Sequence, residues 1–153
     1  MYKRILIPLD GSPSSEAVFQ HIQSFAQAFD AEIILLQVLL EPTEEFAVPI
    51  SPLSPPKAIR KLQTKTKTYL KKVCAKLEKG GTRTSYLIRQ GGIPETILEV
   101  AEIMKADLIA MSSHGHSPIR LFLLGSVTYQ VVRHSPIPVL VIRSASLKVQ
   151  ANN

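Results

Sequence analysis

Five short apolar runs recur along the chain, and stretches with helical spacing separate each run from the next. The runs occupy residues 4–9, 31–40, 82–89, 107–111 and 138–143. Most are apolar almost without interruption, as in AEIILLQVLL, which is typical of strands covered on both faces of a parallel sheet. The alternation predicts a doubly wound α/β domain with a five-stranded parallel sheet and right-handed crossovers.

Local signals mark where the helices begin and end. Ser12 is suited to cap a first helix, and Pro13 fits its first position because the missing N–H costs nothing there. The apolar face of that helix comprises Val18, Ile22, Phe25 and Phe29. Residues 41–56 hold five prolines and are expected to form a connector.

The chain's formal net charge of +6 is concentrated in one segment. Residues 57–79 hold nine of the eighteen basic residues and an apolar stripe of Ile59, Leu62, Thr66, Tyr69, Leu70, Val73 and Leu77. This spacing predicts an amphipathic helix whose lysines form a solvated face, and Gly80-Gly81 is a sensible end for it. An acidic partner, RNA or an anionic membrane is the alternative for this face. Nucleic acid is not expected, since aromatic residues for base stacking are missing there.

Length and composition predict one domain at residues 1–144 and a tail at 145–153. No apolar stretch approaches the roughly 20 residues that cross a bilayer, and the start of the chain lacks the pattern of a signal peptide. A cytoplasmic location without membrane association is therefore expected. Cys74 is the only cysteine, so the chain can form neither an internal disulfide nor a cysteine-based zinc cluster.

Small polar residues follow two of the strands. Asp10, Gly11 and Ser12 follow the first strand, and the run Ser112 to Ser117 follows the fourth. Ligands of open parallel sheets collect beyond the carboxyl ends of strands where the strand order reverses. The backbone N–H groups of such a loop and of the helix opening at Gly125-Ser126 can together bind an anion such as phosphate. Simple turn chemistry is the alternative explanation.

Other kinds of site are less well supported. His114 and His116 have the H-x-H spacing of a metal pair, but no further ligand is placed to complete a set, so no metal site of the protein's own is expected. The nucleophile elbow G-x-S-x-G, the dinucleotide fingerprint G-x-G-x-x-G and the Walker phosphate loop are all missing. No catalytic residue is therefore assigned.

The spacing of the glycines carries a resemblance to a known family. Gly115, nine further residues and then Gly125-Ser126 resemble the signature G-x2-G-x9-G-(S/T) of the universal stress protein family. The opening YKRILIPLDGSPSSEA and the closing SVTYQVVRHSPIPVLVIR also look like that family's first strand and its final helix and strand. The resemblance spans nearly the whole chain and is weakest in the proline connector.

This resemblance implies a Rossmann-like sheet of strand order 3-2-1-4-5 that holds an adenine nucleotide, ATP with Mg²⁺, where strands 1 and 4 diverge. Asp10 would face the ribose or adenine, Val38 would meet the adenine, and Gly115, Gly125 and Ser126 would hold phosphates. The full set implied by the resemblance is Pro8, Leu9, Asp10, Val38, Met111, Ser112, His114, Gly115, His116, Gly125, Ser126, Val127 and Thr128. The magnesium ion would be held mainly by phosphate oxygens.

The implied function is that of a stress-response regulatory or signalling protein with at most slow ATP hydrolysis. One position departs from the family pattern, because Ser112 replaces the first glycine of the signature and its Cβ restricts positive φ. The alternative is a protein-interaction module that no longer binds nucleotide. The resemblance also implies a homodimer in which the last strand, Val139, Leu140, Val141 and Ile142, pairs with its copy.

Overall fold

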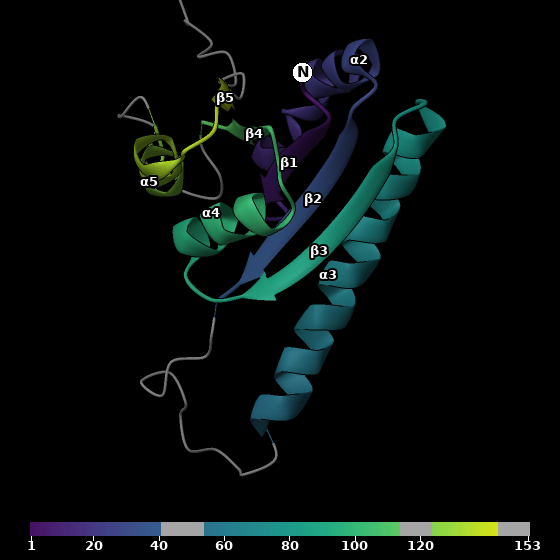
Figure 1. Cartoon of the computed structure of the whole chain (residues 1–153). Coiled ribbons are helices and arrows are strands. Elements are labelled where there is room, and N and C mark those ends of the chain that lie inside the picture. Colours follow the sequence, from purple (N-terminus) through teal and green to yellow (C-terminus); the bar gives the residue numbers. More distant parts are fainter. Residues whose placement is uncertain (41–53, 114–123, 144–153) are drawn as a thin grey trace, which may run out of the picture.

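The computed structural model describes residues 1–40, 54–113 and 124–143, which form one five-stranded sheet with helices on both faces (Figure 1). The strands are β1 (Arg4–Leu9), β2 (Glu32–Leu39), β3 (Thr84–Gln90), β4 (Leu108–Ser112) and β5 (Val139–Ile142). The helices are α1 (Pro13–Glu16), α2 (Phe19–Phe29), α3 (Ser54–Lys79), α4 (Ile93–Ile103) and α5 (Ser126–His134). The predicted alternation of strands and helices is confirmed.

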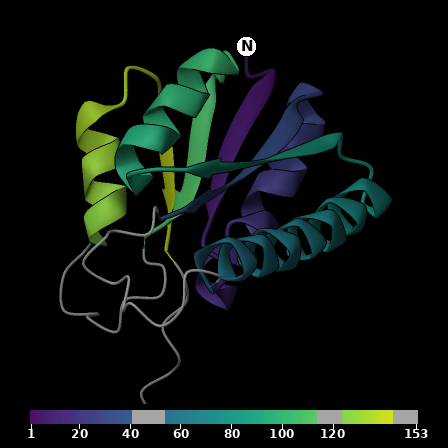
Figure 2. The same ribbon diagram turned by 90° about the horizontal axis from the view of Figure 1, so that it is seen from below.

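All neighbouring strands are parallel, and their order is β3-β2-β1-β4-β5, as the family resemblance implied. The helices α2 and α3 cover one face of the sheet, while α4 and α5 cover the other (Figure 2). Because both faces are covered, successive strand residues are buried in different layers: Ile5 and Ile7 face α2 and α3, and Leu6 faces α4 and α5.

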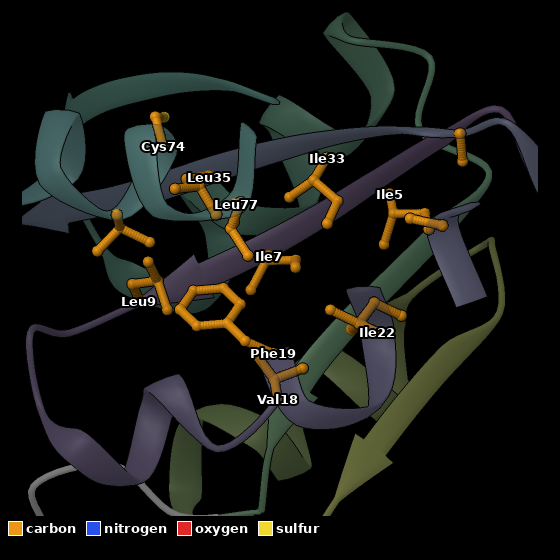
Figure 3. Packing of buried hydrophobic residues seen from close by; sticks show 14 of the residues in the cluster. Ile5, Ile7, Leu9, Val18, Phe19, Ile22, Ile33, Leu35, Cys74 and Leu77 are labelled. Carbon is orange, nitrogen blue, oxygen red and sulfur yellow. The ribbon is translucent and has the colours of Figure 1, made fainter. Parts of the chain in front are cut away.

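The layer under α2 and α3 is the larger of the two apolar clusters. Figure 3 shows Phe19 of α2 pointing toward Leu9 and Ile7 of β1, with Leu77 of α3 closing the cluster from the other side. Cys74 belongs to this cluster, and burial raises the pKa of its thiol to about 11, so it remains protonated near neutral pH. The role of a buried packing residue fits these surroundings.

Three local expectations need correction. The first helix is not continuous, because a turn at Ala17 and Val18 separates α1 from α2. The basic helix begins at Ser54, inside the segment expected to be connector, since prolines are tolerated in a first helical turn. Leu62 is 47% exposed and does not belong to the buried stripe of α3, which starts only at Thr66.

The connector from 41 to 53, the loop from 114 to 123 and the tail from 144 lie outside the described residues. Within the described ranges, no helix combines the length and apolar character needed to cross a bilayer.

One carboxylate joins the start of β1 to the start of β4. Asp107 accepts hydrogen bonds from the backbone N–H groups of Lys3, at 2.7 Å, and Arg4, at 2.9 Å. These two bonds hold the pKa of Asp107 below its usual range, because they favour the ionised form. The interaction secures the first residues of the chain to the sheet.

We expect Asp107→Asn to lower the free energy of unfolding by about 1 kcal/mol at pH 7, because the acceptor of two hydrogen bonds loses its charge. The folded-state pKa of Asp107 is lowered, so its contribution is present above the unfolded pKa near 4 and is lost as pH falls through the folded value. Urea unfolding at pH 7 and pH 3 measures this. A difference between wild type and variant that stays the same at both pH values contradicts it, and Glu102→Gln on α4 controls for loss of an exposed carboxylate.

Candidate functional site

The candidate site lies where β1 and β4 separate. β1 pairs with β2 along its whole length, from Arg4 to Leu9, but with β4 only at Ile5 and Leu6. Because β3 and β2 lie to one side of β1 and β4 and β5 to the other, the strand order reverses here. A crevice at the carboxyl ends of β1 and β4 is the usual ligand position in such a sheet.

The end of β1 leads into a turn that holds Asp10. The carboxylate oxygen Oδ1 of Asp10 accepts hydrogen bonds from the backbone N–H of Ser12, at 2.9 Å, and from its hydroxyl, at 2.6 Å. The Ser12 Oγ in turn accepts from the backbone N–H of Ser15 at 3.1 Å, which confirms Ser12 as a helix cap. Gly11 has φ +80°, so the turn favours glycine. Asp10 is thus exposed at the edge of the sheet while its orientation is fixed by α1.

The end of β4 is joined to both β5 and α5. Ser113 donates its backbone N–H to the Ile142 carbonyl and accepts from the Gly125 N–H at its own carbonyl, both at 2.8 Å. The hydroxyl of Thr128 donates to the Ser112 carbonyl at 3.0 Å. These bonds hold the first turn of α5 against the carboxyl end of β4, although more than ten residues separate the two in sequence.

The first turn of α5 presents backbone donors. Gly125 caps the helix in an extended conformation, and the first intrahelical bond runs from the Tyr129 N–H to the Gly125 carbonyl at 2.9 Å. Within the described part of the chain, the N–H groups of Ser126, Val127 and Thr128 have no acceptor. Such groups, with the positive end of the helix dipole, form an anion-binding arrangement. The buried Thr128 hydroxyl already donates its hydrogen to the Ser112 carbonyl, so only the backbone N–H of Thr128 can donate to a ligand.

Strand alternation divides the remaining predicted residues between the two faces of the sheet. Pro8, Val38 and Met111 lie on the face of α4 and α5, where Val38 is only partly buried. Leu9 is buried in the opposite layer, so only its backbone can line the crevice. Pro8 lies two residues beyond Leu6, the last residue of β1 that pairs with β4, so its missing N–H removes no bond to β4.

Ser112 is the last residue of β4 rather than part of the loop to which the sequence assigned it. Among the described residues other than glycine, only Asp30 and Lys105 have positive φ, so the backbone at Ser112 does not require a glycine. By alternation its side chain lies on the face of α1 and α2, where it is 7% exposed. The departure from the signature is accommodated without backbone strain.

His114, Gly115 and His116 lie outside the described residues, so the first half of the signature loop stays a prediction. Among the described residues, no group of three or more His, Cys, Asp or Glu side chains could hold a metal ion.

Sequence reasoning missed two residues near the crevice. Ser113 was treated as one member of a polar run, yet its backbone joins β4, β5 and α5. Gln37, on β2, has a buried Oε1 without a hydrogen-bond partner in the described structure, and its amide nitrogen lies 3.9 Å from the position of a Cβ on Gly11. The sequence does mark Gln37, because it is the one polar residue inside the apolar run IILLQVL of this strand.

A partly buried tyrosine lies near the turn that holds Asp10. The hydroxyl of Tyr69, on α3, donates to a carboxylate oxygen of Glu16, on α1, at 2.9 Å. Burial, reinforced by the negative charges of Glu16 and Asp10, holds the pKa of Tyr69 well above its usual range. Tyr69 therefore keeps its proton and connects the basic helix to the helix that orients Asp10.

Comparison with known proteins gives consistent results. The model of the "Universal stress protein family" matches residues 1–143. The universal stress protein MJ0577 of Methanocaldococcus jannaschii is 31% identical over 155 aligned residues, which cover 94% of this chain and 96% of the relative. A solved structure of MJ0577 superposes with a TM-score of 0.81 at 33% identity, covering 96% of this chain and 99% of that one.

Two other solved structures share the fold at lower identity. One is a universal stress protein in complex with cAMP, with a TM-score of 0.69 at 23% identity, covering 94% of this chain and 98% of that one. The other is a universal stress protein of Archaeoglobus fulgidus in complex with dAMP, with a TM-score of 0.65 at 19% identity and coverage of 92% and 97%. Since the family model spans nearly the whole chain, the protein belongs to the universal stress protein family.

Proposed function

We propose that this protein binds an adenine nucleotide, ATP with Mg²⁺, in the crevice between β1 and β4, and acts as a regulatory or signalling protein of the stress response. The observation that carries the proposal is the first turn of α5, whose N–H groups have no acceptor among the described residues and which Ser113 holds at the carboxyl edge of the sheet. The cAMP and dAMP bound by two proteins of the same fold support adenine as the base.

Each described residue has a role that follows from its position. The N–H groups of Ser126, Val127 and Thr128 would donate to phosphate oxygens, and the Asp10 carboxylate would accept from the ribose hydroxyls. The apolar surface of Pro8, Val38 and Met111 would contact the adenine. The backbone of Leu9 and Ser112 would line the crevice between them, and His114, Gly115 and His116 would complete the phosphate loop.

The magnesium ion would be held through the nucleotide. The donors at α5 are N–H groups, which bind anions rather than cations, so phosphate oxygens would supply most of its ligands. Bound magnesium would neutralise phosphate charge. Hydrolysis is expected to be slow at most, because phosphoryl transfer depends on positioning and Asp10 is assigned to the ribose end of the ligand.

A proline at position 126 tests the helix amides directly. Ser126 is the first residue of α5, where proline is compatible with a helix, and Gly125 already has the extended conformation (φ −65°, ψ 158°) that precedes proline. Ser126→Pro should therefore keep the fold but remove one N–H, lowering affinity for Mg-ATP by roughly tenfold or more in isothermal titration. Ser126→Ala keeps the N–H and should retain more affinity than Ser126→Pro.

The proposal fails if wild-type protein shows no binding of Mg-ATP up to millimolar concentration, or if Ser126→Pro binds as tightly as wild type while its thermal midpoint is unchanged.

Position 112 separates the proposal from the interaction-module alternative. Because Ser112 needs no positive φ, we expect Ser112→Gly to change ATP affinity by less than about threefold and to lower stability by roughly 0.5–1 kcal/mol, the usual effect of glycine inside a strand. Parallel titration and urea unfolding of the variant give both values. A large gain in ATP affinity would instead indicate a decayed site and favour a protein that acts only through partners.

We also propose a homodimer through β5. Within the described sheet β5 pairs only with β4, so its other edge is open, and Leu140 on it is 37% exposed. The adjacent helix α5 exposes Tyr129 and Val132, which are 50% and 43% accessible. Pairing of β5 with its copy in a second chain would give hydrogen-bond partners to the backbone groups of the open edge and cover apolar surface. The paired residues would be Val139, Leu140, Val141 and Ile142.

Sedimentation velocity at micromolar concentration should show a dimer, and Leu140→Lys should convert it to a monomer by placing a charge in the interface. Ile103→Lys on α4 is the matched control, since Ile103 is 60% exposed and lies away from β5. A wild-type monomer, or equal dissociation by the control, would refute the β5 dimer.

A further inference from the structure

The stripe of α3 that faces the core begins at Thr66 and continues through Leu70, Cys74 and Leu77, all of which are buried. Beside the line of this stripe, the first part of the helix presents a polar side. Arg60, Gln63, Thr64 and Lys67 follow the spacing i, i+3, i+4, i+7, so they share one side of the helix, and all four are exposed. From residue 60 to residue 65 the helix buries no side chain.

A hollow lies between this polar side of α3 and β3. It has a volume of about 450 Å³ and is lined by the four polar side chains and by Ile88 of β3. Ile88 is partly buried against the core and forms an apolar floor. The helix α3 lies beside β3, and Figure 1 shows its first turns continuing past the carboxyl end of the strand. Pockets of this volume bind small organic molecules.

The charges around the hollow define what it can bind. Arg60 and Lys67 are exposed, and neither forms an ion pair among the described residues, where the two bridges join Asp30 to Lys3 and Arg83. Among the described residues, no acidic side chain lines the hollow. Arginine binds oxyanions with two parallel N–H groups, and Gln63 and Thr64 add neutral donors between the two cations.

We propose that the hollow between α3 and β3 is a second ligand site, which binds a small molecule carrying two or more oxyanion groups. Arg60 and Lys67 are seven residues apart, or about 10 Å along the helix axis, so a ligand with anionic groups at both ends can engage both. Phosphate and carboxylate groups share this chemistry. The site is distinct from the β1–β4 crevice, because it lies on the edge strand, across β2 from β1.

The remaining lysines of α3 provide the matched control. Lys72 and Lys79 are both exposed and lie one above the other on the helix, roughly 140° around it from Lys67. They contribute the same charge as Arg60 and Lys67 but do not line the hollow. A polymer such as RNA would be bound by charge on any side of the helix, whereas a small ligand in the hollow depends on one side.

The test is a ¹⁵N NMR titration of the full chain with sodium tripolyphosphate and, separately, with citrate, at constant ionic strength. We expect saturable shifts at residues 60–67 and at Ile88, and the tighter of the two probes identifies phosphate or carboxylate as the preferred group. The R60Q/K67Q double variant should weaken binding at least tenfold, while K72Q/K79Q should change it less than twofold.

Two results would overturn the proposal: no saturable shift at residues 60–67, or equal weakening of binding by both double variants. Failure here is separate from failure of the nucleotide site. The R60Q/K67Q variant should keep its affinity for Mg-ATP, and shifts confined to residues 124–128 would report phosphate at α5 only.

Discussion

The geometry of the crevice depends on the two hydrogen bonds that the backbone of Ser113 forms. Its N–H continues the ladder to β5 through Ile142, while its carbonyl accepts from Gly125 at the start of α5. The Thr128 hydroxyl adds a second bond to the same strand end, so two hydrogen bonds fix the first turn of α5 where β1 has already separated from β4.

On the other side of the crevice, short-range hydrogen bonds fix the position of Asp10. Asp10 is oriented by Ser12, which simultaneously caps α1, and α1 is connected to α3 through Glu16 and Tyr69. The raised pKa of Tyr69 keeps its hydroxyl protonated, so the hydroxyl remains a donor to Glu16. The Asp10 carboxylate is therefore fixed at the end of β1, and the N–H groups of α5 are fixed at the end of β4.

Much of this architecture could be predicted from the sequence, because it depends on local signals. The apolar runs located all five strands, and Ser12 with Pro13 located the start of α1. What could not be predicted depends on contacts distant in sequence. Whether Leu62 is buried depends on how far α3 extends past β3, and whether Ser112 is strand or loop depends on its register with Ile142. The strand order came from the family resemblance, since periodicity carries no information about which strands are neighbours.

The distribution of charge explains why the net charge of +6 is a poor guide to the proposed nucleotide site. The donors at α5 are peptide N–H groups, whose positions are set by the helix and whose dipoles carry no net charge. The cations are instead gathered on α3, at the opposite side of the sheet from α5. Salt screens exposed side-chain charges strongly but affects short hydrogen bonds from a fixed backbone much less. The two sites proposed at opposite sides of this sheet would therefore bind anions in different ways, and their affinities would depend differently on ionic strength.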